Sequence, residues 1–151
     1  MNEFDKTMMQ RALALAKDAG DAGDVPVGAV LTKDDAIIAE CVNECERAHD
    51  ATAHAEILAI SKACKALHST RLSDCTLYVT MEPCPMCAGA ILHARVGRVV
   101  YAAKDAREGA FGSLLNLPAY PLESKPIVES GLYEHESLEL LSTFFRKRRK
   151  K

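Results

Sequence analysis

Two short motifs, far apart in the chain, constrain its fold more than any other feature. The first is His54-Ala55-Glu56 and the second is Pro83-Cys84-Pro85-Met86-Cys87. One imidazole and two thiolates form a set of three protein ligands for a catalytic zinc ion, whose fourth position stays open for water. Glu56 is then left over for proton transfer. The chain must therefore fold so that His54, Cys84 and Cys87 meet.

The first motif lies at the predicted start of a helix. Thr52 is a suitable N-cap for a helix whose apolar residues run from Ile57 to Leu67, which places His54 and Glu56 in the first turn. Residues two apart differ by about 200° around a helix, so these side chains share no lateral face. They converge only above the helix N-terminus.

The second motif also predicts a helix start. It follows a predicted strand, 76–81, and Pro85 suits the first helical position. Cys84 and Cys87, three residues apart, are then neighbours on the opening turn. Two helix dipoles and a cation at one point would lower the thiol pKa values, so that both cysteines bind as thiolates.

The rest of the chain alternates helices and strands. Apolar spacing predicts a helix over 3–19, strands over 25–31, 36–42 and 98–102, and a helix over 136–148 with Leu138, Leu141, Phe144 and Phe145 on its apolar side. Pro26 belongs at the beginning of its strand, and Lys33-Asp34-Asp35 predicts a hairpin turn before the next, antiparallel strand. Segments 43–51, 104–112 and 118–126 are predicted as loops. This order predicts one domain over 1–151 with a three-layer α/β fold, a mixed central sheet with helices on both faces.

Composition argues against a membrane or secreted protein. The apolar runs are too short to cross a bilayer, and the first five residues lack the basic start of a signal peptide. The six cysteines have no secretory context that would favour disulfides. We therefore expect a cytoplasmic protein with reduced thiols.

Charge is distributed unevenly along the chain. The net charge is −2, yet residues 146–151 are all basic, so the remainder carries an acidic excess. A basic end on an acidic body indicates a localised anionic partner such as a nucleic acid. Short basic ends are also often only solubilising, and charge leaves both interpretations open.

The metal site itself has two interpretations. A closed structural zinc site wants four protein ligands, for which His49, His68 or His93 would have to supply the fourth. A catalytic site needs three ligands and gives Glu56 a role beside His54. The catalytic interpretation is favoured because both half-motifs come with their expected strand and helix contexts.

The motifs resemble a known enzyme family. H-x-E followed by P-C-x-x-C is the signature of zinc-dependent nucleobase deaminases. The chain is similar to bacterial tRNA-specific adenosine deaminases, of the cytidine/deoxycytidylate deaminase superfamily, over segments 24–31, 52–57, 76–90, 97–100, 105–106, 109–110, 112–114 and 144–146. Two places depart from the family pattern. Ala51 replaces the proline that usually precedes Thr52, and residues 116–125 do not match the family sequence.

The resemblance implies a fold, a reaction and partners. The fold would be cytidine-deaminase-like. The reaction would convert the wobble adenosine of an arginine tRNA anticodon stem-loop to inosine, with one Zn²⁺ per subunit of a homodimer and Glu56 carrying protons. Substrate contacts would come from Asn43 at the base, from Pro26 and Val27 as pocket wall, from Lys104, Asp105 and Arg107 at flanking nucleotides, and from Phe145 and Arg146 in the basic helix near phosphates. Asn43 equally suits a turn, and Pro26 and Val27 equally suit a strand core.

Three alternatives share some of these features. A deaminase of a free base or nucleoside (guanine, cytosine, cytidine) would use the same zinc residues without needing the basic helix. A DNA or RNA cytidine deaminase would differ in the product base. A non-catalytic zinc-binding interaction module would bind metal and release no ammonia.

Overall fold

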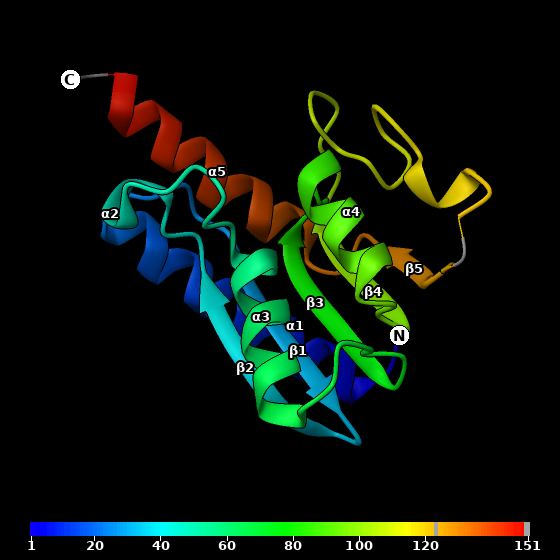
Figure 1. Cartoon of the computed structure of the whole chain (residues 1–151). Coiled ribbons are helices and arrows are strands. Elements are labelled where there is room, and N and C mark those ends of the chain that lie inside the picture. The colour runs from blue at the N-terminus through cyan, green and yellow to red at the C-terminus, as the bar shows by residue number, and fades with distance from the viewer. Residues whose placement is uncertain (123, 150–151) are drawn as a thin grey trace.

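A five-stranded mixed sheet forms the centre of the protein (Figure 1). The computed structural model describes residues 1–122 and 124–149. In the order β2-β1-β3-β4-β5, the strands are β2 (Ala36–Val42), β1 (Gly28–Lys33), β3 (Cys75–Met81), β4 (Arg98–Ala103) and β5 (Ile127–Ser130). β1 is antiparallel to β2 and β3, whereas β3, β4 and β5 are parallel.

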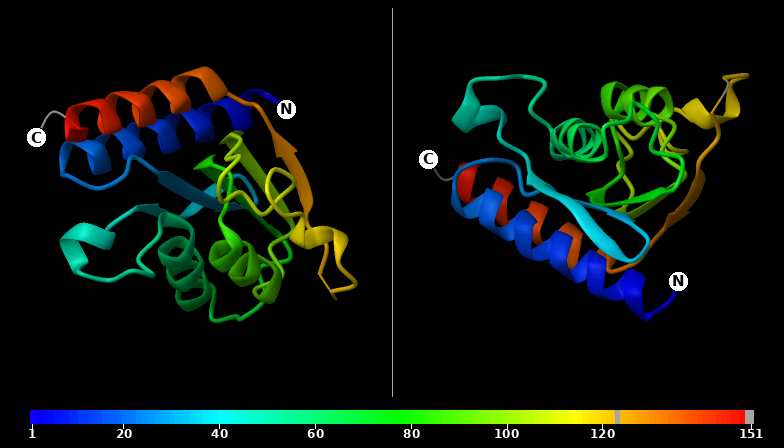
Figure 2. Two further views of the ribbon diagram at one scale, coloured as in Figure 1. Left: turned by 90° about the horizontal axis from the view of Figure 1, so that it is seen from above. Right: turned by 60° about the horizontal axis from the view of Figure 1, so that its bottom comes forward.

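Helices cover both faces of this sheet. α1 (Glu3–Asp21) and α5 (Glu134–Arg149) run side by side over one face, and α3 (Ala55–Leu67) and α4 (Pro85–His93) cover the other (Figure 2). A separate apolar cluster fills the space on each side of the sheet. The predicted three-layer arrangement is confirmed. Over residues 1–122 and 124–149, no helix has both the length and the apolar character needed to cross a membrane.

The predicted hairpin is confirmed, but its first strand begins later than expected. Asp34 and Asp35 both adopt positive φ, 51° and 62°, as the tight turn of a two-residue hairpin requires. β1 starts only at Gly28, so Pro26 lies before the strand. A Cβ on Gly28 would lie 2.1 Å from the carbonyl oxygen of Ala12, which shows how closely α1 packs against the backbone there.

The prediction that Thr52 caps the helix was wrong. The Thr52 amide and hydroxyl both donate to Asp50 Oδ1, at 2.9 and 2.7 Å, which engages this side chain in the preceding loop. The N-cap is His54, in an extended conformation, and α3 starts at Ala55. His54 therefore precedes the first turn that contains Glu56.

Three further elements differ from the sequence prediction. α2 (Cys45–Ala48) lies within a segment predicted as a loop. The short 3-10 helix η1 (Leu117–Ala119) overlaps the start of the loop predicted over 118–126, and β5 was not predicted. β5 has four residues, and Ile127 is 63% exposed, so the strand carries little local signal and depends on pairing with β4.

The apolar face predicted for the terminal helix is partly wrong. In α5, Ser137 and Leu141 are buried, whereas Leu138 and Phe145 are exposed. The Ser137 hydroxyl donates to the carbonyl oxygen of Thr80 in β3, and this bond turns the Ser137 side of the helix toward the sheet.

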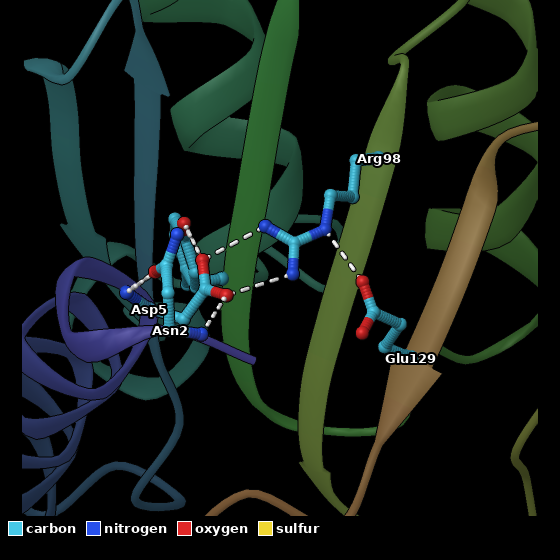
Figure 3. A network of polar contacts seen from close by, with 5 residues as sticks. Asn2, Asp5, Arg98 and Glu129 are labelled. Carbon is cyan, nitrogen blue, oxygen red and sulfur yellow. Dashed lines mark hydrogen bonds and ion pairs between the residues drawn. The ribbon is translucent and has the colours of Figure 1, made fainter.

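An ion-pair network around the buried Asp5 carboxylate joins the start of α1 to the sheet (Figure 3). Asp5 is 2% exposed and accepts hydrogen bonds from two Arg98 nitrogens, at 2.8 and 2.9 Å, and from the Tyr78 hydroxyl at 2.6 Å. The Asn2 amide also donates to Asp5, and Arg98 Nε donates to Glu129 in β5. One carboxylate thus connects α1, β3 and β4, and through Arg98 it connects them to β5.

Replacing Asp5 with asparagine is expected to lower the free energy of unfolding by about 3 kcal/mol near neutral pH, because one partner of a buried pair is lost. The Arg98 hydrogen bonds hold the pKa of Asp5 well below its ordinary value. A depressed folded-state pKa stabilises the protein above the unfolded-state pKa, and this stabilisation is lost as pH falls through the folded value. Denaturant unfolding should therefore show a difference between wild type and Asp5→Asn that shrinks on acidification.

Glu129→Gln is the matched control for this network. Its carboxylate is 35% exposed and bonds Arg98 from the outer side, so we expect a loss below about 1 kcal/mol. An equal loss for the two variants would contradict the central place given to Asp5.

Candidate active site

Two helix starts bring the predicted metal ligands together. His54 is the N-cap of α3, Cys84 is the N-cap of α4, and Cys87 lies in the first turn of α4. Their candidate ligand atoms all lie within 4.8 Å of one another. His54 Nδ1 is 3.3 Å from Cys87 Sγ and 3.7 Å from Cys84 Sγ. The N-termini of α3 and α4 therefore meet, as predicted, and the three side chains lie together there.

The donor set and its spacing fit zinc. With Zn–S near 2.3 Å and Zn–N near 2.0–2.1 Å, a tetrahedral site separates its nitrogen and sulfur ligands by roughly 3.5 Å. The two measured separations lie on either side of that value. Within the described part of the chain, no fourth His, Cys, Asp or Glu joins this cluster. His49 and His68 instead end α2 and α3 as left-handed C-caps. The geometry therefore fits a site with three protein ligands.

The two thiols are electrostatically different. The pKa of Cys84 is lowered to about 4, chiefly because its sulfur accepts a hydrogen bond from Cys87 and also interacts with His54. The same hydrogen bond, together with burial, raises the pKa of Cys87. Binding zinc through both sulfurs would therefore require Cys87 to release its proton.

Glu56 lies beside the ligands as a buried carboxyl group. It is 4% exposed and sits in the first turn of α3. Burial raises the pKa of Glu56 to about 6 by disfavouring its charged form. A carboxyl group that titrates near neutral pH is suited to accepting and returning a proton.

A cavity of about 540 Å³ opens over His54, Glu56 and Cys84. Of the predicted substrate contacts, it contains Val27, Asn43, Asp105, Arg107 and Phe145. It also contains residues that sequence analysis missed: Val25, Ala55, Met81, Glu82, Glu108 and Leu141. Only Glu82 carried a sequence signal, as an acidic residue between an apolar strand and the Pro-Cys motif.

The structure does not bring Pro26, Lys104 or Arg146 into this cavity. Pro26 lines a groove between α1 and α5, on the opposite side of its segment from Val25 and Val27, as expected where neighbouring residues of extended chain alternate. Lys104 lines a separate hollow beside Phe111 and Ser130. Arg146 is exposed on α5.

Asn43 lines the cavity and also holds a turn. Its Nδ2 donates to the Val25 carbonyl oxygen at 3.3 Å, and its Oδ1 accepts from the Cys45 amide at 3.1 Å. The turn role is therefore present. Because an amide has two N–H groups and two lone pairs, one donor and one acceptor stay available on Asn43.

A basic hollow adjoins the cavity. Arg107, Phe145, Arg148 and Arg149 surround about 460 Å³, and Arg107 and Phe145 belong to both spaces. The Arg148 guanidinium lies over the Phe144 ring, 5.4 Å from its centroid, and 3.8 Å from Glu46. Guanidinium groups beside an exposed aromatic ring suit a phosphate and a stacked base.

Comparisons with known proteins agree with this geometry. Residues 2–149 match the model of the MafB19-like deaminase family. A tRNA-specific adenosine deaminase of Haemophilus influenzae is 48% identical, over 98% of this chain and 87% of the relative.

Two solved structures share the fold. One, from studies of A-to-I editing by tRNA:A34 deaminases at the wobble position of transfer RNA, has a TM-score of 0.87 and 46% identity, covering 89% of this chain and 99% of the other. The guanine deaminase of Bacillus subtilis has a TM-score of 0.66 and 41% identity, covering 99% of this chain and 95% of the other. By its site, its fold and these likenesses, the chain belongs to the family of bacterial tRNA-specific adenosine deaminases.

Proposed function

We propose that this protein hydrolyses the wobble adenosine of an arginine tRNA anticodon to inosine, using one zinc ion per subunit. The observation that carries the proposal is the joined site: a three-ligand cluster with a buried Glu56 lies in a cavity that opens onto a basic, aromatic hollow. A flipped base would enter the cavity, while its neighbours and their phosphates occupy the hollow.

His54, Cys84 and Cys87 would hold the metal, which when bound supplies Lewis acidity that lowers the pKa of a water molecule. Glu56 accepts a proton from the attacking water and donates one to the adenine ring nitrogen next to the reacting carbon. It then takes the second proton from the hydroxyl group that has added to the reacting carbon and passes it to the amino group. The C–N bond breaks, and water and adenosine yield inosine and ammonia. Burial raises the pKa of Glu56 to about 6, and a carboxyl group with that pKa can both accept and donate a proton near neutral pH.

Substrate recognition would divide between the cavity and its rim. The remaining amide groups of Asn43 pair with a purine edge, and Val25 and Val27 pack on the ring. Asp105 at the cavity and Arg107, shared by the cavity and the hollow, contact flanking nucleotides, and Phe145 stacks on one of them. Lys104 and Arg146 lie outside the cavity and would contact the RNA backbone through charge alone.

Assembly as a homodimer in the cytoplasm is part of the same proposal. Residues 88–96 offer little surface for an interface, because Ala88, Ile91, Leu92, Ala94 and Val96 are at most 6% exposed. The exposed apolar residues Leu114, Leu115, Tyr120 and Leu122 lie further along the chain and suit an interface better. Sedimentation equilibrium should give twice the subunit mass.

The deciding experiment incubates the zinc-loaded protein with total tRNA, free adenosine and free guanine, followed by mass spectrometry of the products. We expect inosine in tRNA only. Xanthine from guanine would favour the second candidate, a guanine deaminase, which the structural likeness to the Bacillus subtilis enzyme supports. Bound zinc without any product would favour the non-catalytic module.

A further inference from the structure

A second buried carboxylate, Glu82, connects the metal-binding motif to residues 105–113 of the chain. It follows β3, lies two residues before Cys84, and is 3% exposed. Its side chain lines the cavity, yet the proposed proton transfers do not use it.

Among the described residues, the hydrogen-bond partners of the Glu82 carboxylate all lie in one loop, residues 105–113. Its Oε1 accepts from the Asp105 amide at 3.1 Å and from the Ser113 hydroxyl. Its Oε2 accepts from the amides of Phe111, at 3.0 Å, and Ser113, at 3.1 Å. Four donors from the 105–113 loop thus converge on one carboxylate.

The loop is shaped to accept this carboxylate. A Cβ on Gly109 would lie 2.4 Å from the Glu82 carboxyl group, so only glycine allows the approach. The Ala110 amide also donates to the Pro83 carbonyl oxygen at 2.8 Å, beside Cys84. The loop is therefore held directly against the start of α4.

The loop in turn presents side chains to substrate. Asp105 Oδ1 accepts from the amides of Arg107 and Glu108, at 3.0 and 3.2 Å, which fixes the turn that carries Arg107. Asp105, Arg107 and Glu108 all line the cavity, and Arg107 extends into the basic hollow. The order of contacts runs from Glu82 to Asp105 and then to Arg107.

We propose that Glu82 is a positioning residue, which holds the 105–113 loop so that Arg107 meets the nucleotides beside the target base. The expected change in KM rests on the proposed RNA substrate, whereas the role of Glu82 in holding the loop does not. Glu82 acts through the loop, so its loss should weaken substrate binding more than the chemical step.

Glu82→Gln tests the inference because it keeps the side-chain size and replaces one acceptor oxygen with a donor that faces N–H groups. We expect KM for tRNA to rise about tenfold while kcat changes by less than about threefold. We also expect faster hydrogen exchange at the amides of Phe111 and Ser113, with no change at Val100 in β4. A loss confined to kcat, or unchanged exchange in the loop, would overturn the proposal.

Ser113→Ala tests the same contact from the loop side, on an exposed residue whose change should not prevent folding. It should shift KM in the same direction by a smaller factor, and its effect should be less than additive with Glu82→Gln. Full additivity, or a Ser113→Ala protein with wild-type KM and exchange, would count against the inference. If the wild type forms no inosine in tRNA, the proposed function fails, while the exchange measurements still decide the role of Glu82.

Discussion

Changing Glu56 to glutamine is expected to lower kcat for adenosine deamination about 10³-fold, because glutamine cannot carry a proton between water, ring and leaving group. Glu56 is outside the ligand cluster, so the variant should still bind one zinc ion per chain. Single-turnover inosine formation and metal analysis on the same sample measure both quantities.

Glu108→Gln is the matched control for this change. Glu108 lines the same cavity, but it is exposed, lies in the 105–113 loop and is not part of the ligand cluster. Neutralising it should change kcat by only a small factor. A Glu56→Gln enzyme with near-normal turnover, or one that has lost its zinc, would contradict the role assigned to Glu56.

The second large effect concerns the basic hollow. Replacing Arg148 and Arg149 with glutamine should raise KM for tRNA about tenfold at low salt. It should also make binding less dependent on salt. The slope of log binding constant against log salt concentration should fall in magnitude by up to about 0.9 for each phosphate that the variant no longer neutralises. Substitution keeps the length of α5, whereas truncation after Phe145 would also remove the last turn of the helix with the basic residues Arg146 and Lys147. Truncation should therefore cost more.

The control for charge is the pair Lys62→Gln and Lys65→Gln, which removes the same charge from exposed positions on α3. We expect nearly unchanged KM and salt slope, because these residues lie outside the cavity and the hollow. Equal effects of the two double variants would mean that net charge alone controls binding. Insensitivity of both would favour a small-molecule substrate.

Local chemistry explains which elements were predictable. The Asp34-Asp35 turn and the start of α4 at Pro85 depend on the conformations that those residues allow, and both lie where the sequence predicts them. The Thr52 cap failed because α3 begins only at Ala55 with His54 as its N-cap, which leaves Thr52 in the preceding loop, bonded to Asp50. β5 was missed because an edge strand of four residues exists through its pairing with β4.

The site divides in the same way. Ligand types and helix starts are local properties, so the sequence by itself determined that His54, Cys84 and Cys87 could converge above two helix N-termini with Glu56 beside them. Only the tertiary structure decided which side chains face the cavity, since that depends on contacts between distant segments. It turns Val25 and Val27 inward and Pro26 outward, and it closes the 105–113 loop on Glu82.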